Sequence, residues 1–139
     1  MKETVIVDAG PLVAYFDRSE RNHEWAKACF ARLTEPLVTC EAVIAEALFL
    51  LRRGGISPSA LLQLITRGLL VPSFSLRDEA SQIHSLIERY QNVPMSLADA
   101  CLVRMAEIHT NPKVMTLDSD FTIYRKSNRR VIPVLSPYF

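Results

Sequence analysis

The sequence predicts an α/β fold in which a parallel sheet of about five strands carries helices on both faces. Short apolar runs alternate along the chain with longer segments whose apolar residues recur every three or four positions. No internal repeat or linker divides the chain, and its 139 residues, 49% of them hydrophobic, suffice for one core but are few for two domains. Strands that alternate with helices form parallel sheets covered on both sides. We therefore expect a single three-layer domain over residues 1–139.

The predicted strands are short apolar runs that end at polar or turn-forming residues. The first covers residues 4–7 and stops at the segment Asp8-Ala9-Gly10-Pro11. Four further strands are predicted at residues 37–39, 69–74, 114–117 and 131–135.

The predicted helices are separated by these strands or by short turns. They cover residues 12–17, 20–33, 41–53, 57–67, 76–91, 96–109 and 119–126. Pro11 favours the start of the first helix, because the missing N–H of a proline needs no partner there. Gly54 and Gly55 favour the end of the third. The segment 76–91 is strongly amphipathic, so one of its faces is expected to cover the sheet.

Composition restricts the class of protein. Sixteen basic and 15 acidic residues leave a formal net charge of +1 at pH 7, so we expect no broad basic face that coats nucleic acid. The three cysteines are far apart in sequence, which argues against a zinc site and favours a reducing compartment. Asp8 and Pro11 interrupt the apolar start of the chain, and no apolar run is long enough to cross a bilayer. We therefore expect a cytoplasmic protein with no membrane segment.

Four acidic residues occupy positions that a solvated surface does not explain, and a fifth, Asp120, could join one of them. Asp8 follows the first predicted strand, and Asp118 follows a later one, with Asp120 two residues beyond it. Glu46 is the only polar residue of an otherwise apolar helical segment, so we expect it to be buried. Asp99 lies in the first turn of its helix among apolar neighbours. Ligands of parallel sheets bind beyond the carboxyl ends of the strands, so these acids could share one crevice.

Each acid also has a purely local explanation, and at this stage both explanations stay open. Asp8 could form an Asx-turn, and Asp118 could cap the following helix. Asp99 could belong to a capping box that opens its helix. Glu46 could pair with a buried arginine such as Arg104. Taken together, however, converging carboxylates repel one another unless a cation lies among them.

A cation held by these acids is expected to be Mg²⁺ or Mn²⁺. Carboxylates and water are the ligands that such hard ions prefer, and no histidine or cysteine stands at metal-ligand spacing. Ions of this kind polarise a phosphoryl oxygen and lower the pKa of water, which makes phosphodiester hydrolysis the default chemistry. No glycine-rich phosphate loop or dinucleotide motif occurs, so we expect no nucleotide cofactor.

Four segments resemble the motifs of PIN-domain ribonucleases. They are Val5-Ile6-Val7-Asp8-Ala9-Gly10-Pro11-Leu12-Val13-Ala14, Ala45-Glu46, Ser96-Leu97-Ala98-Asp99-Ala100 and Thr116-Leu117-Asp118-Ser119-Asp120-Phe121. Their order and spacing match, so the resemblance extends over essentially the whole chain. It implies a PIN-like domain that acts as a Mg²⁺- or Mn²⁺-dependent endoribonuclease, in which metal-activated water hydrolyses RNA. It also implies the catalytic and metal-binding residues, which are Asp8, Glu46, Asp99 and Asp118, with Asp120 replacing or assisting Asp118.

The resemblance further implies partners. Small PIN-domain proteins are commonly VapC-type toxins that a co-encoded antitoxin holds inactive, and a homodimer is a family expectation. Two other functions stay open: a catalytically silent PIN-fold module that binds RNA or protein, and a phospho-acceptor signalling domain. The second would need an acidic pair after the first strand, whereas Ala9 and Gly10 follow Asp8.

Several neighbouring side chains could support the acids. Ser96 and Thr116 could orient them or water, or could serve only as a cap and a strand residue. A basic segment after the last acid could hold RNA phosphates or form a solvated loop. Its cations are Arg125, Lys126, Arg129 and Arg130.

Overall fold

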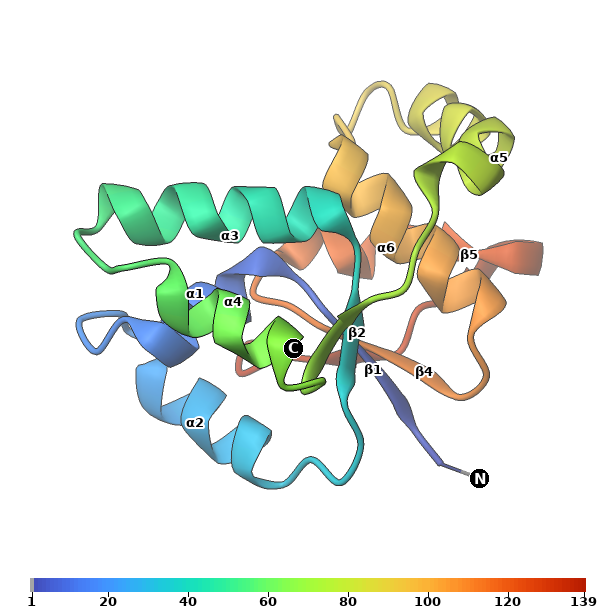
Figure 1. Cartoon of the computed structure of the whole chain (residues 1–139). Coiled ribbons are helices and arrows are strands. Elements are labelled where there is room, and N and C mark those ends of the chain that lie inside the picture. The colour runs from blue at the N-terminus through green and yellow to red at the C-terminus, as the bar shows by residue number, and fades with distance from the viewer. Residues whose placement is uncertain (1) are drawn as a thin grey trace.

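A five-stranded parallel sheet forms the centre of the computed structural model, which describes residues 2–139 (Figure 1). In spatial order its strands are β3 (Leu70–Pro72), β2 (Leu37–Thr39), β1 (Thr4–Val7), β4 (Pro112–Met115) and β7 (Val134–Leu135). Every neighbouring pair runs parallel. The predicted fold class is therefore confirmed.

Within the described residues, six α-helices surround this sheet. They are α1 (Ala9–Phe16), α2 (His23–Ala31), α3 (Glu41–Arg53), α4 (Ser59–Thr66), α5 (Leu76–Arg89) and α6 (Leu97–Ile108). Helices α1, α2 and α4 lie on one side of the sheet and α5 and α6 on the other (Figure 1). Helix α3 packs on both α1 and α6. Over the range that the structure covers, none of these helices has the length and apolar character needed to cross a membrane.

The strand order reverses at β1, and this reversal positions the candidate site. From β1 the chain proceeds outward through β2 to β3, and then returns to β4 on the opposite side of β1. The connections that leave the β1–β4 pair therefore diverge, which opens a crevice beyond the carboxyl ends of these two strands. Asp8 lies at this point, where its N–H donates to the Met115 carbonyl oxygen at 2.9 Å.

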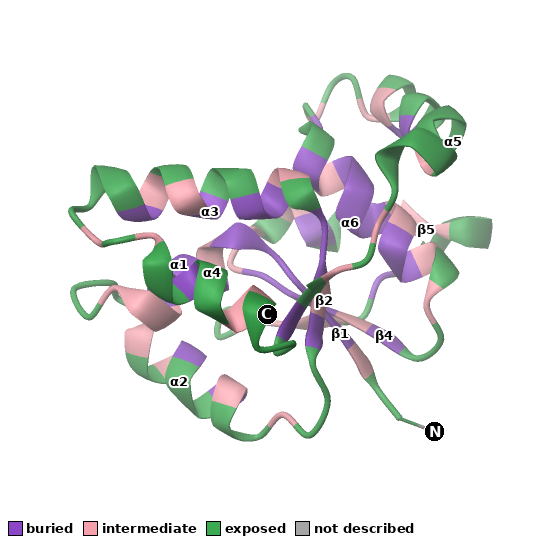
Figure 2. Cartoon of the chain, in the orientation of Figure 1, coloured by how far each residue is buried: buried purple, intermediate pink, exposed green. Residues whose placement is uncertain are grey.

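The two central strands and α6 form the most deeply buried part of the molecule. Ile6 and Val7 of β1, like Val114 and Met115 of β4, have no exposed surface. Figure 2 shows the same burial along α6, which packs on both strands. A strand that is buried on both faces is apolar throughout, which explains the uninterrupted apolar run in β1. The acids next to these elements are therefore attached to a rigid frame.

The first helix starts earlier than the sequence predicts. The expected range is 12–17, whereas α1 begins at Ala9. The Asp8 side chain accepts a hydrogen bond from the Ala9 N–H and caps the helix. Pro11 therefore occupies the third helical position, where its missing N–H still has no intrahelical partner. The second helix is shorter than the predicted 20–33 and covers only His23–Ala31.

The segment after β4 differs most from the prediction. A helix over residues 119–126 is wrong, because the chain forms a 3-10 turn, η1 (Ser119–Thr122), and then enters an antiparallel hairpin. The hairpin consists of β5 (Arg125–Lys126) and β6 (Arg130–Val131), joined by η2 (Ser127–Arg129). The single predicted strand over 131–135 is thus divided between β6 and β7. Two-residue strands carry no detectable alternation, so the pattern did not reveal them.

The apolar helix α3 is only partly covered by the rest of the protein. Val43, Ala47 and Leu51 are buried on its inner side. Glu46 is exposed, and Phe49 keeps 62% of its surface exposed. The prediction that Glu46 is buried is therefore wrong. The apolar surface of α3 exceeds what the sheet and the neighbouring helices cover, which leaves apolar side chains in contact with solvent.

Candidate active site

Four acidic side chains from separate segments line one cavity of about 430 Å³ at the reversal point of the sheet. They are Asp8 after β1, Glu46 in α3, Asp99 in the first turn of α6 and Asp118 after β4. The remaining lining residues are Gly10, Leu50, Ser96 and Leu117. The fold thus brings together the four acids that the sequence singled out.

Asp8 is the most buried of these acids, with 8% of its surface exposed. Its Oδ1 accepts a hydrogen bond from the Ala9 N–H at 2.8 Å, and its Oδ2 accepts one from the Thr116 hydroxyl at 2.7 Å. Burial raises the pKa of Asp8 to about 6, although the two hydrogen bonds act in the opposite direction. The negative charges of Asp99 and Glu46 raise this pKa further. A cation beside Asp8 would lower this pKa, because a positive charge stabilises the carboxylate.

The Thr116 hydroxyl connects two of the acids. It is buried, donates to Asp8 and accepts a hydrogen bond from the Asp118 N–H at 3.0 Å. One hydroxyl can make both bonds, because it has a donor hydrogen and acceptor lone pairs. Thr116 therefore fixes the start of the loop that carries Asp118 relative to Asp8.

Asp118 and Asp120 differ in where their side chains lie. Asp118 lines the cavity, and its Oδ1 accepts a hydrogen bond from the Asp120 N–H at 2.9 Å. Asp120 is not among the residues described as lining the cavity. The pKa of Asp120 is nevertheless raised, first by partial burial and then by the charges of Asp118 and Asp99. Asp120 therefore lies close enough to Asp118 and Asp99 to be affected by their charges.

Asp99 is held by groups from two elements. Its Oδ2 accepts the Ser96 N–H at 3.3 Å, and the Ser96 hydroxyl accepts the Asp99 N–H at 3.0 Å, which completes a capping box. The same Oδ2 accepts a hydrogen bond from the Tyr124 hydroxyl at 3.1 Å. Burial and the charge of Asp99 raise the pKa of Tyr124, so its hydroxyl stays protonated and can donate at neutral pH.

Tyr124 is a site residue that the sequence did not reveal. It lies 25 positions from Asp99, in a segment predicted to be helical. The only signal was an aromatic residue shortly after the last acidic motif, and aromatic residues are frequent in any core. Its contact with Asp99 depends on how the segment after η1 packs on α6.

Glu46 lies at the rim of the cavity, on the exposed side of α3. Within residues 2–139 no arginine or lysine pairs with it, and Arg104, the partner considered from sequence, pairs with two other glutamates. Partial burial raises the pKa of Glu46, and the charges of Asp99 and Asp118 add to this effect. The local explanation of Glu46 is therefore wrong.

The three aspartates also have local roles as helix caps. Asp8 caps α1 in place of the Asx-turn considered from sequence. Asp99 belongs to the capping box of α6, and Asp118 caps η1. The partial positive charge at a helix N-terminus stabilises a carboxylate. Capping therefore helps to hold three negative charges around one cavity, and it is compatible with a shared ligand.

The chemistry of the cavity fits a hard divalent cation. Carboxylates are the only charged groups among the described lining residues, and oxygen ligands of this type suit Mg²⁺ and Mn²⁺. Their mutual repulsion contributes to the raised pKa values of Asp8 and Glu46. Among residues 2–139, no group of three or more histidine, cysteine, aspartate and glutamate side chains already has the arrangement of a metal site. A cation would therefore have to draw these acids closer together.

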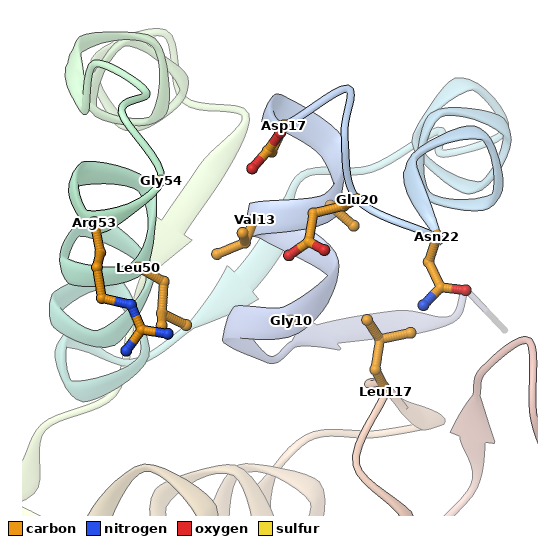
Figure 3. A pocket seen from close by; sticks show the side chains of 10 residues that line it. Gly10, Val13, Asp17, Glu20, Asn22, Leu50, Arg53, Gly54 and Leu117 are labelled. Atoms are coloured by element: carbon orange, nitrogen blue, oxygen red, sulfur yellow. The ribbon is translucent and has the colours of Figure 1, made fainter.

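A second cavity, of about 290 Å³, adjoins the first. Gly10, Leu50 and Leu117 line both, and Figure 3 shows the two leucines on opposite sides of the glycine. A Cβ on Gly10 would lie 3.2 Å from Leu117 Cδ1, so glycine permits the loop after β4 to pack closely on α1. Asp17 and Glu20 add two negative charges to this second cavity, and Arg53 adds one positive charge. The two adjoining cavities therefore extend the candidate site beyond the carboxylates.

Comparison with known families agrees with this geometry. The family model of the PIN domain matches residues 5–127, a range that contains every acid of the cavity. The chain belongs to the PIN domain family. The resemblance inferred from the four sequence motifs is thus confirmed.

Two proteins of Mycobacterium tuberculosis are similar to this PIN domain. The ribonuclease VapC26 (strain ATCC 25618 / H37Rv) is 28% identical over 116 residues, which cover 82% of this chain and 86% of the relative. The crystal structure of VapC20, a sarcin–ricin-loop-cleaving toxin, superposes with a TM-score of 0.74 at 20% identity, covering 86% of this chain and 94% of VapC20. The structural match shows that the PIN-like α/β architecture is shared.

Proposed function

We propose that this PIN domain is an endoribonuclease that hydrolyses RNA phosphodiester bonds with the help of Mg²⁺ or Mn²⁺. The observation that carries the proposal is the convergence of four carboxylates on one cavity, with no basic side chain among its described lining residues. Such a lining repels an RNA phosphate unless a divalent cation lies between them. The similarity to the ribonuclease VapC26, which extends over most of both chains, supports the same activity.

Asp8 and Asp99 are the proposed central ligands, because both are held by hydrogen bonds on buried elements. Glu46 would bind from the rim, directly or through water, and Asp118 would complete the set. Asp120 would assist or replace Asp118. A divalent ion held by these residues supplies positive charge to the phosphoryl oxygen and lowers the pKa of a water molecule.

The residues around the acids act as positioning groups. Thr116 holds Asp8, while Ser96 and Tyr124 hold Asp99. Removal of the groups that orient metal ligands typically lowers the affinity for the metal. In the proposed reaction water attacks phosphorus and the ribose 3′ oxygen leaves, so the products carry a 5′ phosphate and a 3′ hydroxyl.

Cleavage of a mixed panel of messenger, transfer and ribosomal RNA in Mn²⁺ tests this proposal. We expect cutting by the purified protein, and loss of cutting both in EDTA and in Asp99→Asn. A cyclic phosphate on the products would contradict the mechanism, because it would show attack by the ribose 2′ hydroxyl. An absence of cutting by partner-free protein that binds Mn²⁺ would instead favour the catalytically silent PIN-fold module.

We further propose that the protein is a toxin whose activity an antitoxin protein suppresses. Its structural relative VapC20 is a toxin. Apolar side chains are exposed on consecutive helices, notably Phe49 of α3 and Leu62 of α4. A cavity of about 250 Å³, lined in part by Tyr15, Phe30 and Leu64, offers a partner helix an apolar surface. A second copy of this chain could use the exposed apolar residues as well, and we propose a homodimer.

Expression in bacteria and light scattering test these partner proposals. Expression of the chain should arrest growth, and Asp99→Asn should relieve the arrest. The purified protein should have twice the mass of one chain. A monomer at every concentration would contradict the homodimer, and unaffected growth despite active enzyme would contradict the toxin.

We place the protein in the cytoplasm. Its three cysteines, Cys29, Cys40 and Cys101, are buried and form no disulfide. Cys40 and Cys101 are nevertheless close enough to hydrogen-bond to one another. Neighbouring thiols stay reduced in the cytoplasm, which supports this location.

A further inference from the structure

A fourth cavity, of about 790 Å³, lies between α5, α6 and the β5–β6 hairpin. It is termed the basic groove, and its lining residues are Arg89, Tyr90, Arg104, Glu107 and residues 125–129. Five of these side chains are cationic and one is acidic, whereas the whole chain has a net charge of only +1. Positive charge is therefore concentrated at this place.

Two of the five cations in the basic groove already have partners. Arg104 forms ion pairs with two glutamates, and the Arg125 guanidinium donates to three backbone carbonyl oxygens of the preceding turn. The other three form no ion pair within residues 2–139 and are exposed or half-exposed. They are Arg89, Lys126 and Arg129. These three cations are available to a ligand.

Cationic residues of the β5–β6 hairpin stand at positions where they lower its stability. Lys126 lies directly opposite Arg130 in the antiparallel register, where like charges repel. Asn128 and Arg129 have φ angles of 61° and 58°, in the left-handed region that is unfavourable for residues with a Cβ, least so for asparagine. A sequence shaped only by the fold would avoid both features. An anionic ligand between Lys126 and Arg130 would relieve the repulsion between these two cations.

Two tyrosines that pack on each other connect the basic groove to the candidate active site. Tyr90 lines the groove, and its hydroxyl accepts the Arg125 N–H at 2.9 Å. The Tyr90 ring packs edge-on against Tyr124, with centroids 5.1 Å apart, and Tyr124 donates to Asp99. The helix α6, which carries Asp99, contacts α3 as well as α5 and β5 (Figure 1). A bound strand could therefore continue from the groove across α6 to the carboxylates.

We propose that the basic groove binds the phosphate backbone of an RNA strand at nucleotides outside the cleavage point. The inference rests on the proposed ribonuclease function, which makes RNA the substrate. Exposed arginine and lysine side chains hold phosphates in nucleic-acid complexes, and an aromatic side chain beside them offers a base a stacking surface. Because the carboxylate cavity repels phosphates until a cation binds, the groove supplies affinity for the strand that the cavity lacks.

Two variants separate RNA binding from folding. Lys126→Glu replaces a repulsive cross-strand pair with an attractive one, and Arg129→Gly relieves the left-handed backbone. Both variants are expected to melt at or above the temperature of the natural protein. Lys126→Glu should nevertheless bind a labelled single-stranded RNA about tenfold more weakly in EDTA, with a shallower dependence on salt. Arg129→Gly should weaken binding to a smaller extent. Fluorescence anisotropy measures both effects.

Arg67→Glu is the matched control, because Arg67 is exposed at the end of α4 and lies outside the basic groove. It changes the net charge as much as Lys126→Glu does, and it should bind RNA like the natural protein. Undiminished binding by Lys126→Glu would overturn the proposal and point to an acidic protein as the ligand. An equal loss in Arg67→Glu would also overturn it, since only net charge would then matter.

The same variants distinguish failure of this proposal from failure of the nuclease proposal. RNA binding is measured without metal, so it does not depend on cutting. A natural protein that binds RNA through the groove but never cuts it would contradict only the ribonuclease function. If the protein cuts RNA, both groove variants should raise KM for a long RNA and leave kcat unchanged.

Discussion

Burial and hydrogen bonding have opposite effects on the pKa of Asp8. It caps α1 and accepts the Thr116 hydroxyl, and both hydrogen bonds favour the charged carboxylate. Burial outweighs them and, with the charges of Asp99 and Glu46, raises the pKa from 3.8 to about 6. The folded protein therefore keeps a proton on Asp8 over a pH range in which the unfolded chain has released it.

The pH dependence of stability tests this description of Asp8. Because the pKa in the folded state lies above that of the unfolded chain, the stabilisation is complete below about pH 4 and is lost as the pH rises through about 6. The shift corresponds to about 3 kcal/mol in the free energy of unfolding. Asp8→Asn should remove this part of the pH dependence. Urea unfolding in EDTA at several pH values measures it, and identical pH profiles for the two proteins would contradict the account.

At the scale of elements, α6 joins the fold to the candidate site because its N-terminal cap includes a proposed metal ligand. The Ser96 hydroxyl accepts the Asp99 N–H, and the Asp99 side chain accepts the Ser96 N–H. Helix α5 has a comparable cap, in which the Ser75 hydroxyl accepts the Asp78 N–H at 3.3 Å. Neither residue of the α5 cap lines the carboxylate cavity. The two helices therefore provide a matched pair.

Removal of the two caps should have equal effects on stability and different effects on activity. Ser96→Ala and Ser75→Ala should each lower the free energy of unfolding by about 1 kcal/mol, because each leaves a helix N–H without its cap. Only Ser96→Ala should also reduce Mn²⁺-dependent RNA cleavage, since Asp99 loses a positioning group. Thermal unfolding and cleavage rates measure the two effects. An equal loss of activity in both variants would show that stability alone is responsible.

Some helices and strands could be predicted from the sequence, and others could not. β1, β2 and α3 have the predicted boundaries, because apolar runs define the two strands and Gly54 follows the last turn of α3. The β5–β6 hairpin has no such local signal, since its short strands are defined by pairing with each other. A strand register of this kind depends on packing, which the sequence pattern does not contain.

Some features of the candidate site could also be predicted from the sequence, and others could not. The meeting of Asp8 and Asp118 follows from parallel topology, since both acids come after neighbouring strands. The exposure of Glu46 and the hydrogen bond from Tyr124 to Asp99 depend on how α3 and the segment after η1 pack around α6. The approach of acids that follow neighbouring strands was therefore predictable from topology, whereas the exposure and contacts that depend on helix packing were not.

At the scale of the whole molecule, a net charge of +1 conceals two local regions of opposite sign. The carboxylate cavity is acidic and the basic groove is cationic, and α6 contributes residues to both. Composition alone excluded a broad basic face, but it carries no information on how charges are distributed over the surface. The local arrangement accommodates a polyanionic strand and a divalent cation in one small protein.

Mn²⁺ binding by Glu46→Gln tests most directly the central claim that the four acids form one metal site. The Glu46 side chain has no hydrogen bond or ion pair within residues 2–139, so this change leaves the contacts of the fold intact. Glu41→Gln is the control, because Glu41 is exposed on the same helix and lies outside the cavity. In titration calorimetry, Glu41→Gln should bind Mn²⁺ like the natural protein, and Glu46→Gln should bind it at least about tenfold more weakly. Equal affinity in all three proteins would contradict the claim.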